Sequence, residues 1–471
     1  MLFSSTTFLL VFLPIVLLLY YTVFLKHRLA QNIFLFFVSL IFYAWGEPWF
    51  VLIMLLSIVM NWIFGLLVDK YRDHPLLSKL ILTLTIVYNL VVIFIFKYLI
   101  FTITNVNLLF HKDFAIPEIT LPIGISFFTF QAISYVIDVY RRHGEVQKNP
   151  LNVGLYIAFF PQLIAGPIVR YETIAEQILY RKETFKGFSD GVIRFIRGLA
   201  KKVLLSNTLA IVADLAFSTE TAELSVGMAW LGAICYTLQI FFDFSGYSEM
   251  AIGLGKMFGF DFLENFNFPY ISASVSEFWR RWHISLGTWF KDYVYFPLGG
   301  SRVKTKSRLV FNLFVVWFLT GLWHGANWTF IAWGLLYFVL LTLEKLTGFE
   351  KKAKCKPLRI VYTLLFVIIG WVLFRSNDIA QAGDYLKVMF TNSSGILWDN
   401  NAYFYLCENA FFLLAAVLCS TPIFKWLSTK CKLEQNKVIG FLYPFFYLAL
   451  FIVSLSYIVK GAYNPFIYFN F

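Results

Sequence analysis

The amino-acid sequence predicts an all-α, polytopic membrane protein with roughly ten to twelve membrane-spanning helices, plus re-entrant and interfacial helices. Hydrophobic residues make up 59% of the 471 residues, charged residues only 14%, and the mean hydropathy is +0.71. Soluble domains usually carry about 25% charged residues, so a chain this poor in charge needs lipid around much of its surface. Apolar runs of spanning length also recur along the whole chain.

Each expected span is a run of about 20 mostly apolar residues, the length that crosses the hydrocarbon core as a helix. The clear runs cover residues 7–25, 48–68, 80–100, 225–243, 309–323, 327–344, 358–374, 403–420 and 439–460. Less regular runs cover residues 33–46, 121–138 and 153–168. We expect one membrane domain over 1–471, with N-terminal helices at 1–150, a core at 151–346 and C-terminal helices at 347–471.

The net charge of +12 fits a membrane protein better than a nucleic-acid-binding one. Lys and Arg gather in short loops between apolar runs, as at 301–308 and 351–359, and such loops face the cytoplasm. No soluble basic domain is visible, so we expect no nucleic-acid partner. The five cysteines lack CxxC or Cys/His spacing, so we expect no metal site and no disulfide framework. We also expect no permanently bound cofactor.

Two segments depart from simple spans. Residues 188–205 place basic residues among apolar ones at helical spacing, which predicts an amphipathic helix at the cytoplasmic interface. Residues 160–171 carry Pro161, Gly166 and Pro167 in an apolar stretch, which predicts a re-entrant or broken helix.

His324 is the first candidate for chemistry. It lies in 320-TGLWHGANW-328, where Gly321, Gly325 and Asn327 weaken the helix between two apolar runs. Irregular backbone at membrane depth is tolerated only inside protein or along a wet cavity, and an ionisable residue there is a functional candidate. The alternative is a histidine at a helix end that hydrogen-bonds a neighbouring carbonyl.

His283 is the second candidate, in 277-EFWRRWHISLGTWFKDYVYFPLGG-300. Basic, acidic and aromatic residues alternate there, as in an interfacial pocket that binds phosphates and a ring. The same pattern also describes an interfacial aromatic belt with snorkelling Arg and Lys, and composition alone favours the belt.

Two acidic residues lie in the apolar run 239-QIFFDFSGYSEMAIG-253. Asp243 and Glu249 should therefore face the protein interior and be paired. Ser245 lacks the strand–turn–helix setting of a nucleophile elbow, so we assign it a structural role.

Together these segments resemble the membrane-bound O-acyltransferase (MBOAT) family, in particular its bacterial branch for alginate and peptidoglycan O-acetylation. The matching stretches are MLFSSTTFLLVFLP at 1–14, PQLIAGPI at 161–168, DFSGYSEMAIG at 243–253, FWRRWHISLGTWFKDYVYFPLGG at 278–300 and LWHGANWTFIAWG at 322–334. They keep the family's order over most of the chain.

The resemblance implies a ring of helices around a tunnel, with 151–346 as its catalytic core. It implies that His324 is the catalytic histidine and general base, with His283 as a second catalytic residue that orients it or binds the thioester. It also implies that Asp243, Arg280 and Arg281 belong to the scaffold of the active tunnel. The substrate-binding residues we expect are Asp243, Arg280, Arg281, Trp282, Lys291, Trp323 and Asn327, with the basic ones placed to meet coenzyme A phosphates. A buried imidazole is held neutral and can accept a proton from an attacking hydroxyl.

The implied reaction moves an acetyl group from cytoplasmic acetyl-CoA across the bacterial cytoplasmic membrane to a cell-envelope polysaccharide. Peptidoglycan is preferred over alginate or another exopolysaccharide, because the Phe-, Lys- and Ile-rich composition is typical of an AT-rich genome, which disfavours the well-known alginate producers. The longest expected outer loop, 375–402, is too short for an esterase-like domain. The resemblance implies that a separate extracytoplasmic SGNH-type partner protein receives the acetyl group and passes it to the polymer.

Two other function classes share the many helices. A transporter or flippase for an envelope precursor usually shows paired repeats with midplane charges in both halves, which this sequence lacks. A catalytically silent scaffold is the other alternative, and it predicts that His324 can be replaced without effect on acetylation.

Overall fold

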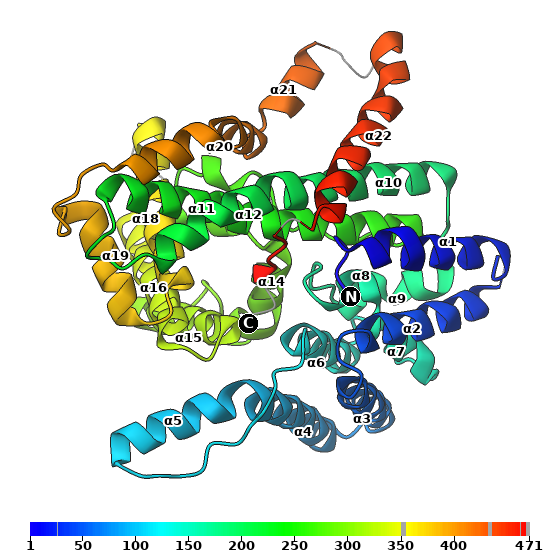
Figure 1. Ribbon diagram of the computed structural model, residues 1–471. Coiled ribbons are helices and arrows are strands. Elements are labelled where there is room, and N and C mark those ends of the chain that lie inside the picture. Colours follow the sequence, from blue (N-terminus) through cyan, green and yellow to red (C-terminus); the bar gives the residue numbers. More distant parts are fainter. Residues whose placement is uncertain (26, 350–354, 432–435, 462, 468–471) are drawn as a thin grey trace. The chain divides into compact units, whose positions relative to one another are not determined.

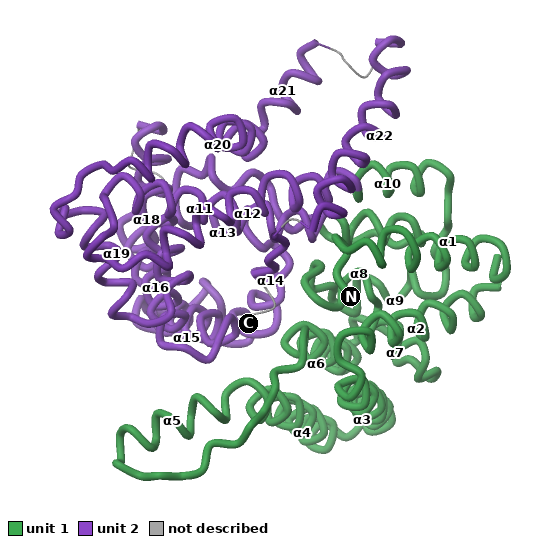
Figure 2. Tube along the Cα trace, in the orientation of Figure 1, with its two compact units in different colours: residues 1–195, 250–263 green, residues 196–249, 264–471 purple. Residues whose placement is uncertain are grey.

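The computed structural model describes residues 1–25, 27–349, 355–431, 436–461 and 463–467, and this part of the chain contains helices and no strands. Part of the basic segment predicted at 351–359 therefore lies outside the described residues. The chain divides into two compact units (Figure 2). Unit 1 comprises residues 1–195 and 250–263, and unit 2 comprises residues 196–249 and 264–471.

Unit 1 is built from the N-terminal helices (Figure 1). They are η1 (Phe8–Phe12), α1 (Leu13–Thr22), α2 (Arg28–Ala44), α3 (Phe50–Lys70), α4 (Pro75–Ile93), η2 (Phe94–Tyr98), α5 (Leu99–Phe110), α6 (Ile125–Arg141), α7 (Pro150–Ala158), α8 (Phe160–Leu163), α9 (Tyr171–Tyr180) and most of α10 (Phe185–Ala200). The short helices labelled η are π-helical turns, except η4 in unit 2, which is a 3₁₀ turn. The helix expected at 33–46 is thus the C-terminal part of α2.

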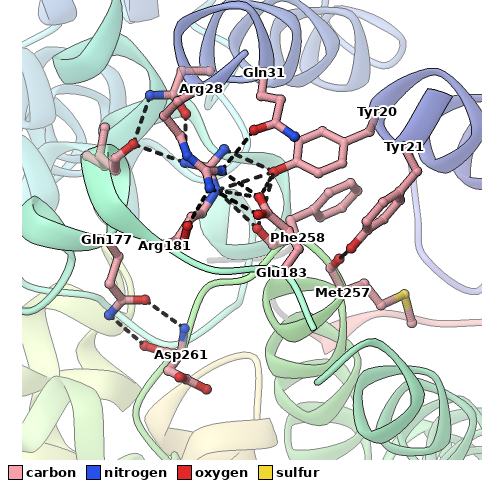
Figure 3. A network of polar contacts seen from close by, with 12 residues as sticks. Tyr20, Tyr21, Arg28, Gln31, Gln177, Arg181, Glu183, Met257, Phe258 and Asp261 are labelled. Atoms are coloured by element: carbon pink, nitrogen blue, oxygen red, sulfur yellow. Dashed lines mark hydrogen bonds and ion pairs between the residues drawn. The ribbon is translucent and has the colours of Figure 1, made fainter. Parts of the chain in front are cut away.

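Two networks of polar side chains join helices inside unit 1. Asn61 on α3 and Asn89 on α4 exchange amide hydrogen bonds of 3.2 and 2.8 Å, which joins two apolar helices at a fixed register. Figure 3 shows a second network, in which Glu183 accepts hydrogen bonds from Tyr20 and Arg28, both of 2.5 Å. This network ties the first two helices to the loop after α9.

Unit 2 contains the remaining helices. They are η3 (Lys201–Ser206), α11 (Asn207–Ser218), most of α12 (Val226–Met257), η4 (Pro269–Ile271), α13 (Val275–Arg281), α14 (Ile284–Phe290), η5 (Lys291–Tyr295), α15 (Lys306–His324), α16 (Trp328–Thr347), α18 (Lys356–Arg375), α19 (Ile379–Thr391), α20 (Asn400–Cys419), α21 (Ile423–Lys430) and α22 (Lys437–Val459).

The helical membrane-protein class predicted from composition is confirmed. Within the described residues, seven helices are long and apolar enough to cross a membrane. They are Phe50–Lys70, Pro75–Phe110, Val226–Met257, Trp328–Thr347, Lys356–Arg375, Asn400–Cys419 and Lys437–Val459. Two shorter apolar helices, Phe8–Thr22 and Arg28–Ala44, precede them.

The predicted irregular segments also adopt irregular structure. The helix expected at 153–168 breaks at Phe159, whose ψ of 114° ends α7 before Pro161 opens the four-residue α8. The amphipathic segment 188–205 is helical through α10 and then widens into the π-helical η3. Lys202 at this transition is buried, although the pattern predicted an interfacial position for it.

Candidate functional site

His324 is the last residue of α15, and the helix ends there for local reasons. Gly325 adopts an extended backbone with φ −176°, and Asn327 caps α16 by accepting a hydrogen bond from the backbone N–H of Thr329 at 3.0 Å. The Asn327 amide also donates to the carbonyl of Asn377 at 2.8 Å. The break predicted from 320–328 is therefore present, and the predicted substrate-binding residue Asn327 helps to form it.

Glycines allow the α15–α16 hairpin to close tightly around this break. A Cβ on Gly334 would lie 2.5 Å from the carbonyl oxygen of Trp317, and one on Gly321 would lie 2.5 Å from that of Phe330. Such contacts leave no space for any side chain. The hairpin therefore places His324 against the first turns of α16, which Figure 1 shows beside α15.

The His324 imidazole lies in an aromatic enclosure. Its ring centroid is 5.0 Å from Trp323, 4.9 Å from Trp333 and 5.2 Å from Phe374, all in edge-to-face geometry. The residue is only 4% exposed. The surrounding rings therefore keep most water away from the His324 side chain.

His283 lies at another helix break, between α13 and α14. It is the N-cap of α14 with φ +45° and ψ 53°, a left-handed conformation that is uncommon outside glycine. Its Nδ1 lies 3.2 Å from Oδ1 of Asn265, and the backbone N–H of Ile284 donates to the Asn265 carbonyl at 3.0 Å. Backbone strain of this kind clusters at functional sites, where surrounding contacts hold it in place.

The His283 ring is packed between aromatic side chains and is 2% exposed. Phe244 of α12 meets it edge-on with centroids 4.5 Å apart, and Trp323 lies 6.0 Å away. His283 lies outside the seven spans, and burial lowers its pKa to about 3. The ring is therefore neutral at physiological pH.

Trp323 connects the two candidate histidines, since its ring contacts both His283 and His324. The structure thus brings together three residues that the sequence placed in two separate motifs. Two buried imidazoles around one indole can exchange protons with a bound hydroxyl or thiol. This constellation lies entirely within unit 2.

Trp282 belongs to the same aromatic cluster by way of Trp371. The Trp371 ring lies 4.9 Å from Trp282, 6.2 Å from Trp333 and 5.5 Å from Phe374. Trp282 is 2% exposed. Its ring therefore supports the wall of the His324 enclosure.

The charged residues of the 277–300 segment are half-buried or exposed, unlike the two histidines. Arg281 forms an ion pair with Glu277 at 2.8 Å and donates to the Asn267 carbonyl at 3.1 Å. Arg280 and Lys291 are exposed, and Lys291 lies over the Phe296 ring at 5.4 Å. Their substrate-binding roles stay predictions.

Asp243 lies in a buried ion pair, as its position in an apolar run predicts. Its carboxylate is 2.6 Å from Nζ of Lys202, and both side chains are 1% exposed. Asp243 also accepts the backbone N–H of Ile467 at 2.9 Å, and Lys202 donates to the carbonyl of Pro465. Glu249, the other acidic residue of this run, pairs with Lys201 at 2.5 Å.

One group in the described part of the chain has donor atoms close enough to hold a metal ion. It consists of Asp138, His143 and Glu172 in unit 1, with donor atoms within 4.8 Å of one another. Glu172 is already 2.8 Å from Arg170, and Asp138 accepts the Glu172 backbone N–H at 3.1 Å. These contacts account for the cluster as an ion-pair network.

Sequence reasoning missed several residues that shape the site. Trp333 falls inside a matching motif, and Glu344 is a carboxylate in an apolar run, so both carried a signal. Glu344 accepts hydrogen bonds from Val275 N and Ser276 N at 2.7 and 2.9 Å, which caps the start of α13. Asn265 could not be predicted, because no sequence pattern around it indicates that its side chain contacts His283.

Comparison with known proteins decides the family. A family model for MBOAT, the membrane-bound O-acyltransferase family, matches residues 37–380. The chain belongs to this family. The MBOAT family and its named relatives are acyltransferases, so this chain is a multi-pass membrane acyltransferase.

Individual relatives place the chain among its bacterial members. It is 43% identical to a probable alginate O-acetylase of Pseudomonas aeruginosa, over 83% of this chain and 75% of the relative. It is 31% identical to a peptidoglycan O-acetyltransferase of Helicobacter pylori, over 100% and 98% of the two chains. A teichoic acid D-alanyltransferase of Bacillus subtilis is 34% identical over 54% of this chain and 69% of its own. The resemblance drawn from the five motifs is thus confirmed.

Proposed function

We propose that this MBOAT protein transfers an acetyl group from cytoplasmic acetyl-CoA across the bacterial cytoplasmic membrane for O-acetylation of a cell-envelope polysaccharide. The observation that carries the proposal is the buried pair His283 and His324 around Trp323, in a chain related to polysaccharide O-acetylases. Buried imidazoles suit acyl transfer from a thioester to a hydroxyl, because they can take up and return the hydroxyl proton.

In this mechanism His324 is the general base. The hydroxyl oxygen of the acceptor attacks the thioester carbonyl as His324 takes the hydroxyl proton. The carbon–sulfur bond then breaks, and the proton returns from His324 to the thiolate, so that coenzyme A leaves as the thiol. A thiolate leaves readily because a thiol has a pKa of about 8.5.

The charged surface residues have a supporting role in the proposal. Arg280, Lys291, Arg302 and Lys304 are all exposed, and such cations can bind the phosphates of coenzyme A at the cytoplasmic mouth. Arg281 is already paired with Glu277 and is a weaker candidate for phosphate. Asp243 is engaged by Lys202, so we assign its proposed contribution to the frame of the site.

The acceptor has two candidates. Composition favours peptidoglycan, whereas the higher identity to alginate O-acetylases than to the peptidoglycan enzyme favours an alginate-like exopolysaccharide. In either case we propose that a separate extracytoplasmic SGNH-type protein receives the acetyl group and passes it to the polymer. Efficient acetylation of polymer by the purified protein alone would exclude that partner.

The test compares wild type with His324→Ala and His283→Ala in cells that lack the chromosomal copy. O-acetyl groups are measured on purified peptidoglycan and on released exopolysaccharide. We expect loss of His324 to reduce acetylation by about 100-fold or more, the usual contribution of a general base. His74→Ala is the control, since His74 is an exposed histidine of unit 1.

Purified protein with radiolabelled acetyl-CoA then separates the enzyme from its alternatives. Thioester turnover in wild type and its loss in His324→Ala, with folding intact, would support the proposal. Unchanged envelope acetylation in His324→Ala would instead favour a silent scaffold. Substrate flux across liposomes without thioester cleavage would favour a transporter.

A further inference from the structure

We propose that Asn265 is a positioning residue that holds His283 in the tautomer with its hydrogen on Nδ1, so that Nε2 presents its lone pair to a bound O–H or N–H group. This inference rests on the proposed function, because it assigns a chemical task to one of the two histidines. It follows from three contacts between Asn265, which precedes η4, and residues 283–285 at the start of α14.

The first contact fixes the orientation of the Asn265 amide. The backbone N–H of Ser285 points at the Asn265 side-chain oxygen at 3.2 Å, and the Ser285 hydroxyl lies 2.9 Å from the same atom. A backbone N–H can only donate, so the atom that faces it must be the oxygen rather than the amide nitrogen. Asn265 is 1% exposed, so water does not compete for this position.

The second contact assigns the hydrogen on His283. Its Nδ1 lies 3.2 Å from that same oxygen. An amide oxygen only accepts hydrogen bonds, so Nδ1 must carry the hydrogen. Because burial keeps the ring neutral, Nε2 is then unprotonated and can only accept.

The third contact holds the ring in place. The backbone N–H of Ile284 donates to the Asn265 carbonyl at 3.0 Å, so Asn265 binds the backbone after His283 as well as its side chain. This double attachment stabilises the left-handed backbone of His283 (φ +45°). On the opposite side, Nε2 has no hydrogen-bond partner among the residues that the structure describes.

The tautomer selects the chemistry that His283 can perform. A ring with its lone pair on Nε2 can accept a hydrogen bond or a proton from an acceptor hydroxyl, or from an amide N–H of the acyl donor. It cannot donate to a thioester carbonyl. His283 therefore orients or deprotonates a donor group, and another group must stabilise the oxyanion.

The direct test is the ¹⁵N spectrum of histidine-labelled protein in detergent micelles, with His283→Gln used to assign the His283 signals among six histidines. We expect a protonated Nδ1 and an unprotonated Nε2 in wild type. A hydrogen on Nε2, or averaging between both forms, would overturn the inference. The ¹⁵N measurement requires no turnover, so a failure of the proposed function can be distinguished from a failure of the tautomer assignment.

Variants at position 265 test the functional consequence. Asn265→Leu removes the acceptor, so we expect tautomer averaging at His283 and a fall in kcat of about 10-fold or more, with little change in KM for the acyl donor. Asn265→Asp retains an acceptor oxygen, so it should restore the Nδ1–H form and much of kcat at alkaline pH. A folded Asn265→Leu protein with wild-type kcat would refute the positioning role.

Asn312→Leu is the matched control. Asn312 is a fully buried amide of α15 in the same unit, and it donates to the carbonyls of Leu298 and Gly300 at 3.2 and 3.0 Å. Its loss has a comparable structural cost. We expect it to leave the His283 ¹⁵N signals unchanged, whereas a change equal to that of Asn265→Leu would count against a specific role for Asn265.

Discussion

Replacing Lys202 by methionine removes one member of the buried ion pair with Asp243. The two charges lie 2.6 Å apart, which corresponds to an attraction of about 6 kcal/mol at an effective dielectric constant of ~20. Desolvation of both groups offsets much of this attraction, so the intact pair contributes little net free energy. The single variant is different, because it leaves the Asp243 carboxylate buried without its counter-ion.

We therefore expect Lys202→Met to lower the free energy of unfolding by about 3–5 kcal/mol. Asp243 would keep one hydrogen bond from the Ile467 backbone, and the Asn207 side chain would lose its bond of 2.8 Å from the Lys202 ammonium. Unfolding is measured by SDS titration in mixed micelles, followed by circular dichroism. The double variant Lys202→Met/Asp243→Leu should recover most of the loss.

The neighbouring pair Lys201–Glu249 provides the control. Its atoms are equally close, at 2.5 Å, but its side chains are 20% and 18% exposed, against 1% for each member of the buried pair. Water can solvate the charge that remains, so Lys201→Met should cost about 1 kcal/mol or less. Equal costs for the two lysine variants, or strictly additive effects at 202 and 243, would refute the reasoning.

Two further predictions concern packing and pH. Gly334→Ala places a Cβ 2.5 Å from the Trp317 carbonyl oxygen, so it should destabilise the α15–α16 hairpin by about 1–3 kcal/mol and reduce activity. Gly383→Ala has nothing within 4 Å of its Cβ, so it should stabilise the protein by about 0.5–1 kcal/mol. Thermal melts of both variants check these values. Burial raises the pKa of Glu183, but hydrogen bonds, the largest from Arg28, outweigh it and hold the pKa below the usual 4.5. The stability that Glu183 contributes is thus present above pH 4.5 and lost as the pH falls through the lowered pKa. Unfolding curves of wild type and Glu183→Gln should converge at acidic pH, and a constant difference down to that range would contradict the assignment.

Local sequence features located two of the helix breaks in this protein. Glycine and asparagine around His324 predict where α15 ends, and the structure ends it at that residue. Pro161 and Gly166 likewise predict the break after α7. These predictions succeed because helix propensity and capping act over a few residues and need no knowledge of distant segments.

A helical membrane protein could be predicted from the sequence alone, because too few charged residues are present to cover a soluble surface. The sequence also predicted that Asp243 must be paired, since a lone carboxylate in an apolar run is too costly. The folded structure was needed to identify its partner as Lys202 rather than Lys201, because adjacent residues on a helix point about 100° apart. The same holds for Asn265 and His283: their contact joins residues 18 positions apart, and such pairings depend on how a whole chain packs, not on any local preference.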